Sequence, residues 1–230
     1  MSNDKQTRIY PSLRLILLAA IAGLAAGAVA VYVSGGLERN IQTPSIQTTA
    51  VDAEADPACK AKEAASRTAI AAAKGDVAAM LPADPSRSLS SLAFNGPDGK
   101  PMTMAEHSGK TVLLNLWATW CAPCRAEMPA LDALQRDRGS DRFEVVAVNV
   151  DTGDDTKPRK FLADTGVHSL SYYRDNTLGI FETLKKQGLA LGLPVTLLID
   201  GDGCLLGSMN GPAEWSGADA HRLIDAALGG

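Results

Sequence analysis

The chain has 230 residues, of which 46% are hydrophobic and 21% are charged, and its formal net charge is -4 at pH 7. This composition is sufficient for a folded domain with an apolar core, and it excludes a disordered polymer. Because Lys and Arg are not in excess, the charge balance also argues against a protein that binds nucleic acid.

Residues 15–33 form a run of 19 residues without a charge. As a helix that rises about 1.5 Å per residue, this run would cover about 28 Å, close to the thickness of a bilayer's hydrocarbon core. Three basic residues lie within residues 1–14, so the positive-inside rule predicts a cytoplasmic N-terminus and an exported body. A signal peptide cleaved after Ala30 is the alternative, and it exports the same body.

Residues 34–56 mix Gly, Thr, Gln, Ser and Pro without periodicity, which is typical of a flexible tether. An added helical segment is predicted over residues 57–82. Asp56 is a suitable N-cap and Pro57 a suitable first helical residue, and the Ala-rich stretch continues to Lys74 before a Gly stop.

The remaining elements alternate between strands and helices, which predicts an α/β fold whose first strands are parallel. Residues 111–117 are almost continuously apolar, as expected for a central strand covered on both faces. A final hairpin of antiparallel strands makes the predicted sheet mixed. The expected strands are an initial hairpin at 89–94 and around Met102, then 111–117, 143–150, 170–173, 195–200 and 204–209, and the expected helices are 123–138, 156–165, 177–186 and 218–228.

Cys121 and Cys124 stand two residues apart between the central strand and the helix that follows it. Unpaired backbone N–H groups and the helix dipole favour a thiolate at Cys121. The spacing lets Cys124 attack a mixed disulfide formed at Cys121, and Pro123 restrains the turn between them. Half a zinc site and a passive disulfide are the alternatives, but no second CxxC completes a zinc site and so small a ring removes little chain entropy. The pattern therefore favours a redox-active dithiol.

The stretch NLWATWCAPCRAEMPAL resembles the active-site strand and helix of the thioredoxin superfamily. Its motif ATWC.PCR.EMP is similar to that of the membrane-anchored, extracytoplasmic TlpA-like thiol:disulfide interchange proteins. The resemblance covers about residues 85–230. It implies a thioredoxin-like fold, that is, a central mixed β-sheet flanked by helices. The N-terminal transmembrane helix and the added N-terminal helix, expected from their own composition, precede this fold. The resemblance also implies a cis peptide bond at Leu193–Pro194 facing the dithiol, where an ordinary trans proline at the start of a strand is the alternative.

The resemblance bears on proton transfer as well. Cytoplasmic members of the superfamily carry a buried acid six residues before the first cysteine, whereas this chain has Asn115, which cannot titrate. Glu127, about one helical turn after Cys124, matches an acid of the extracytoplasmic relatives and is the candidate proton acceptor; an exposed glutamate that only aids solubility is the alternative. Trp120 is expected to pack beside Cys121 and shield it, and Trp117 is expected in the core.

Cys59 and Cys204 are the two remaining cysteines, and an exported domain with one spare pair favours a structural disulfide between them. Such a bond would join the added helix to the rest of the domain. Two buried free thiols, or a second redox couple, are the alternatives.

These features predict a membrane-anchored extracytoplasmic thiol:disulfide oxidoreductase, a reductase of disulfides in proteins of cytochrome c or cytochrome oxidase biogenesis. Cys121 attacks, Cys124 resolves, and Pro194 shapes the groove in which a client docks. A copper(I) metallochaperone that uses the same dithiol and a disulfide-forming oxidase are the alternatives.

The expected partners are disulfide-bearing clients such as cytochrome or copper-site assembly factors, a membrane electron donor that re-reduces the dithiol, and the lipid bilayer through residues 15–33. Apart from the redox-active pair, no cofactor and no metal is expected. The resemblance implies a single-pass protein of the bacterial inner membrane, with a cytoplasmic N-terminus and a periplasmic catalytic domain.

Overall fold

A computed structural model describes residues 56–229, which form most of one compact unit, Val51–Gly230. The predicted segments 1–14 and 15–33, and the tether up to residue 55, lie outside the described residues. Within the described part of the chain, no helix combines the length and the apolar character needed to cross a membrane.

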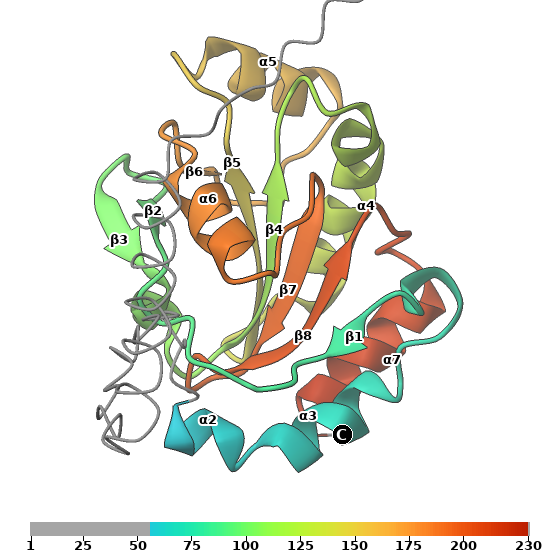
Figure 1. Cartoon of the computed structure of the whole chain (residues 1–230). Coiled ribbons are helices and arrows are strands. Elements are labelled where there is room, and N and C mark those ends of the chain that lie inside the picture. Colours follow the sequence, from blue (N-terminus) through green and yellow to red (C-terminus); the bar gives the residue numbers. More distant parts are fainter. Residues whose placement is uncertain (1–55, 230) are drawn as a thin grey trace, which may run out of the picture. The chain divides into compact units, whose positions relative to one another are not determined.

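An eight-stranded mixed sheet runs through the domain in the order β1-β8-β7-β4-β5-β6-β2-β3 (Figure 1). Every one of the seven residues of the central strand β4 is buried. This strand pairs parallel with β5 and antiparallel with β7, so the predicted mixed sheet is confirmed. The strands are β1 Leu81–Pro82, β2 Ala93–Asn95, β3 Pro101–Thr103, β4 Thr111–Trp117, β5 Phe143–Asn149, β6 Tyr173–Arg174, β7 Val195–Ile199 and β8 Leu205–Asn210.

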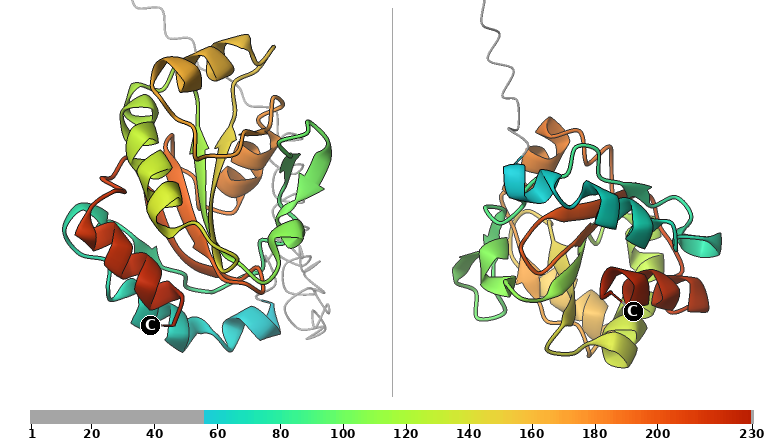
Figure 2. Two further views of the ribbon diagram at one scale, coloured as in Figure 1. Left: turned by 180° about the vertical axis from the view of Figure 1, so that it is seen from behind. Right: turned by 90° about the horizontal axis from the view of Figure 1, so that it is seen from below.

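Helices cover both faces of the sheet. Helix α6 lies on one face, and α4 and α7 lie on the other (Figures 1 and 2). Helix α3 packs against α7 and β8 at one end of the sheet. The α-helices are α2 Pro57–Lys60, α3 Glu63–Ile70, α4 Ala122–Arg138, α5 Thr156–Asp164, α6 Gly179–Lys186 and α7 Ala218–Ala227.

The central elements begin and end within two residues of their predicted limits, because their apolar patterns and caps are local signals. The short elements differ more. The first hairpin is confirmed, but β2 begins only at Ala93, and β6 is limited to Tyr173 and Arg174. Such short strands depend on the partners they find in the sheet rather than on their own sequence pattern.

The added segment 57–82 differs most from its prediction. Asp56 does cap the first helix, accepting a hydrogen bond from the backbone N–H of Ala58 (2.9 Å). The predicted single helix is divided, however, because Lys62 N donates to Cys59 O three residues back and so tightens the chain into a 3₁₀-type turn. Helix α3 then ends at Ile70, and the segment closes with an unpredicted strand, β1, which adds antiparallel to β8.

Candidate active site

The two cysteines of the CxxC motif lie at the start of helix α4, at the end of a loop that leaves the central strand. Cys121 is the N-cap residue of α4, and its Sγ accepts a hydrogen bond from the backbone N–H of Cys124 (3.2 Å). The structure joins Cys121 and Cys124 in a disulfide with a Cα–Cα distance of 5.3 Å. Cys121 is 6% exposed and Cys124 is fully buried. Cys121 is therefore the more exposed of the two residues, and its role as the attacking cysteine stays a prediction.

Asp151, just after β5, holds the loop that leads to the dithiol. Its buried carboxylate accepts hydrogen bonds from the backbone N–H (2.8 Å) and the hydroxyl (2.7 Å) of Thr119. Asn149 Nδ2 donates a third bond to it (2.6 Å). These contacts fix the loop two residues before Cys121. Sequence reasoning missed Asp151, since nothing local links it to a residue 32 positions earlier.

Leu193 and Pro194 precede strand β7, and the peptide bond between them is cis. Val195, the first residue of β7, pairs with Leu116 near the end of β4. Pro194 therefore lies at the same end of the sheet as the dithiol. Pro123 lies in the first turn of α4, where its missing N–H leaves no helical hydrogen bond unmade.

The two tryptophans around the motif have opposite environments. Trp117 is 1% exposed and its ring packs against that of Phe161, which agrees with the predicted core position. Trp120 is 66% exposed, and the expectation that it packs beside Cys121 and shields it stays a prediction. It lies in the turn between β4 and α4, where its side chain projects beyond the packed core. Trp120 is thus a largely exposed aromatic side chain that directly precedes Cys121 in the chain.

Glu127 is buried, with only 3% of its surface exposed, so the alternative of an exposed glutamate is excluded. Its Oε1 accepts a hydrogen bond from Asn115 Nδ2 (2.8 Å), and its Oε2 accepts from Ala213 N (3.1 Å) and Trp215 Nε1 (3.2 Å). Burial raises the pKa of Glu127 to about 7, although the three hydrogen bonds act in the opposite direction. An acid with this pKa can exchange a proton near neutral pH.

The sequence analysis predicted none of the three contacts of Glu127. Trp215 is fully buried and reaches Glu127 from the loop before α7, 88 positions later in the chain. Asn115 was recognised only as the replacement for the usual acid, yet it directly contacts the glutamate. A buried Trp needs a hydrogen-bond acceptor for its indole N–H, and this need is the one signal in the sequence that could have suggested the contact between Trp215 and Glu127.

The structure joins Cys59 to Cys204 in a disulfide across a sequence separation of 145 residues. Both residues are at most 2% exposed. The bond connects α2 to the residue that precedes β8, so it attaches the added segment to the sheet. Both cysteines are less exposed than Cys121.

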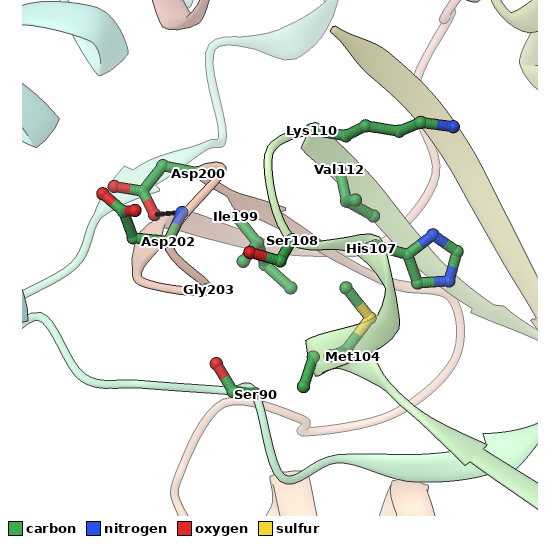
Figure 3. Close-up of a pocket in the computed structure, with 11 residues that line it drawn as sticks. Ser90, Met104, His107, Ser108, Lys110, Val112, Ile199, Asp200, Asp202 and Gly203 are labelled. Atoms are coloured by element: carbon green, nitrogen blue, oxygen red, sulfur yellow. Dashed lines mark hydrogen bonds between the residues drawn. The ribbon is translucent and has the colours of Figure 1, made fainter. Parts of the chain in front are cut away.

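A pocket of about 100 Å³ lies at the other end of β4, where the strand begins (Figure 3). Asp200 and Asp202 border it, but both form ion pairs with Lys62. Among residues 56–229, no group of three or more His, Cys, Asp or Glu side chains could hold a metal ion. The pocket thus lies at the end of β4 opposite to Cys121.

Comparison with known proteins agrees with this geometry. The thiol:disulfide interchange protein HelX of Rhodobacter capsulatus is 38% identical over 116 residues, covering 49% of this chain and 59% of HelX. The corresponding protein CycY of Rhizobium leguminosarum bv. viciae is 32% identical over 136 residues, covering 54% of this chain and 68% of CycY. The thioredoxin-like protein YneN of Bacillus subtilis is 44% identical over 68 residues, 29% of this chain and 39% of YneN. The chain thus spans between about two fifths and two thirds of these relatives.

Solved structures and a family model point the same way. The crystal structure of a protein named as a thiol:disulfide interchange protein DsbE, from Chlorobium tepidum, matches 61% of this chain and 95% of its own with 30% identity and a TM-score of 0.52. The predicted thioredoxin-like fold and the resemblance to thiol:disulfide interchange proteins are confirmed. The family model described as Redoxin matches residues 83–224, more than half of the chain. This chain therefore belongs to the Redoxin family.

Proposed function

We propose that this protein is a thiol:disulfide oxidoreductase that works through Cys121 and Cys124. The observation that carries the proposal is the position of Cys121 Sγ, which caps helix α4 and accepts the backbone N–H of Cys124. In the reduced protein, the same N–H and the positive end of the helix dipole favour a thiolate at this sulfur. Its partner sulfur lies in the first turn of the same helix and is buried.

The exchange proceeds in two displacements. The Cys121 thiolate attacks one sulfur of a client disulfide; a mixed disulfide forms, the client S–S bond breaks, and the other client sulfur leaves as a thiolate. Cys124, deprotonated, then attacks Cys121 Sγ and releases the second client sulfur. Two electrons pass from the dithiol to the client, and Cys121 and Cys124 end in the disulfide that the structure contains.

Glu127 is proposed to take the proton of Cys124. The two residues are three positions apart on α4 and both are buried, so they are neighbours on one face of the helix. The pKa of Glu127, raised to about 7 by burial, lies near the pH at which such a transfer must run in both directions.

Clients are proposed to dock beside Pro194 and Leu193, where the exposed Trp120 next to Cys121 in the chain offers a further apolar contact. An extended client segment could pair with the backbone at this end of β7. The proposed direction is reduction, and the proposed clients are apo-proteins of cytochrome c or cytochrome oxidase biogenesis. Both of these assignments rest on the family resemblance alone.

The catalytic domain, residues 85–230, is proposed to work in the periplasm, anchored in the bacterial inner membrane by residues 15–33 and carried on the tether 34–56. The disulfide between Cys59 and Cys204 supports an oxidising compartment, since such bonds persist outside the cytoplasm. A membrane electron donor is proposed to re-reduce the dithiol, and no cofactor beyond the dithiol is proposed.

Single replacements of the two cysteines test this function. Cys121→Ser is expected to abolish reduction of a model disulfide such as insulin, whereas Cys124→Ser is expected to accumulate a mixed disulfide detectable by mass spectrometry. Full turnover by the Cys121→Ser variant would refute the proposal. The reduction potential tests the direction: a value near -120 mV, typical of an oxidant, would contradict a reductase, and one near -270 mV would support it.

A further inference from the structure

The side-chain amide of Asn115 makes an unusual set of hydrogen bonds. Its Nδ2 donates both to Glu127 Oε1 (2.8 Å) and to Thr196 Oγ1 (3.0 Å). Its Oδ1 is buried and has no partner within the described part of the chain. A buried amide oxygen without a donor costs free energy, so a residue that keeps one in the middle of the central strand calls for a functional reason.

The surroundings of Glu127 supply that reason. All three of its contacts are donors, which suits a carboxylate but leaves a protonated carboxyl group with no acceptor. Two of these donors, the backbone N–H of Ala213 and the indole N–H of Trp215, can only donate. The amide of Asn115 differs, because a half-turn about its Cβ–Cγ bond exchanges oxygen and nitrogen in nearly the same space.

We propose that Asn115 is a positioning residue whose amide turns over when Glu127 accepts the proton of Cys124. The S–H bond of Cys124 breaks with its electron pair left on sulfur, and an O–H bond forms at Glu127 Oε1. This O–H then donates to Asn115 Oδ1, which the half-turn has brought into the place of Nδ2. The inference rests on the proton-accepting role proposed above for Glu127.

The two orientations of the Asn115 amide make the same number of hydrogen bonds. With Glu127 ionised, the amide donates two hydrogen bonds and its oxygen is unpaired. With Glu127 protonated, the turned amide accepts two, from Glu127 and from the hydroxyl of Thr196, and its nitrogen is unpaired. Because the number of hydrogen bonds is the same, neither state of Glu127 is trapped, and the proton can return.

No other charge controls this equilibrium among the residues that the structure describes. The hydrogen-bond partners of Glu127 come from β4 and from the loop before α7, and none of them titrates; on its own helix, the titratable Cys124 stands three positions earlier. Within residues 56–229 no ion pair involves Glu127, and its pKa is set by burial and by the three hydrogen bonds. The turning amide is therefore the one neighbour that can follow its protonation.

Nuclear magnetic resonance of the full chain, selectively labelled at Asn and at Glu carboxyl carbons, tests this inference. Above the titration midpoint of the Glu127 carboxyl, we expect nuclear Overhauser effects (NOEs) between the Hδ2 protons of Asn115 and the Thr196 side chain. Below the midpoint these effects should disappear. Asn210 is the matched control, since its Oδ1 accepts from Leu191 N (2.7 Å) and its Nδ2 donates to Leu189 O (3.1 Å), so its amide should not turn.

The Glu127→Gln variant gives a second readout. Its side-chain oxygen can accept from Ala213 and Trp215, so its NH₂ must face Asn115 and hold the amide in the turned state at every pH. The Asn115–Thr196 NOEs should therefore be absent throughout. Their persistence in this variant, or their persistence in the wild-type chain through a complete Glu127 titration, would overturn the inference.

These outcomes are separable from a failure of the proposed function. If Cys121→Ser retains full turnover while the Asn115 amide still turns with pH, the oxidoreductase proposal is wrong, but the coupling between the amide and Glu127 stands. If turnover depends on Cys121 but the amide does not respond, only the role of Asn115 is wrong.

Discussion

Replacing Glu127 with Gln should change how the stability of the fold depends on pH. Burial raises the pKa of Glu127 from an ordinary 4.5 to about 7, so the folded protein holds this proton more tightly than the unfolded chain does. The resulting contribution to stability is fully present below pH 4.5 and is lost as the pH rises to about 7. At about 1.36 kcal/mol per pKa unit, the loss amounts to about 3 kcal/mol, and the side chain is too buried for solvent to screen much of it.

Urea denaturation of oxidised protein at pH 4.5, 6 and 8 measures this effect. Between the first and last pH, the wild-type free energy of unfolding should lose about 3 kcal/mol more than that of Glu127→Gln, whose side chain is neutral throughout. Glu182→Gln, on the exposed surface of α6, is the matched control and should follow the wild type. Equal pH dependence for Glu127→Gln and wild type would show that the acid is not protonated on folding, and the reasoning from burial would fail.

The same variant tests catalysis, because Glu127→Gln should slow the reaction with a disulfide client more than it changes the stability of the fold. Equal rates for the variant and the wild type from pH 6 to 9 would refute proton transfer through this acid. Replacing Cys59 and Cys204 with Ala should lower the free energy of unfolding by up to about 4 to 5 kcal/mol, the value that the chain-entropy model gives for a loop of this length. An unchanged midpoint of urea unfolding, measured without reductant, would contradict this prediction. Asp151→Ala leaves two donors of the active-site loop without their acceptor and should cost about 2 kcal/mol, measured by thermal unfolding. A hydrogen bond from His107 is the main reason that the pKa of Glu144 falls to about 2. The contribution of ionised Glu144 to the stability of the fold is therefore present above pH 4.5 and lost as the pH falls to about 2. In acid unfolding followed by circular dichroism, Glu144→Gln should lose less stability than the wild type over this range, and identical curves would contradict this prediction.

Much of the fold could be read from the sequence because its signals are local. The apolar run of β4 marks a strand covered on both faces, and the proline and polar caps mark the beginnings of α2 and α4. The division between α2 and α3 and the two-residue strand β1 could not be read. Strand β1 depends on its pairing with β8, and α2 is joined by a disulfide to Cys204; both partners lie more than a hundred residues away.

The candidate site likewise has features that the local sequence determines and features that depend on the packing of distant segments. The spacing of Cys121 and Cys124 and their place at a helix start are properties of four neighbouring residues, so the sequence alone was enough to predict a reactive dithiol. The setting of Glu127 is not local. Its pKa depends on burial, on Asn115 from the central strand and on Trp215 from a distant loop, which only the packed domain brings together. Desolvation and hydrogen bonding act through space, so the tertiary structure alone decides which form of this acid exists near neutral pH.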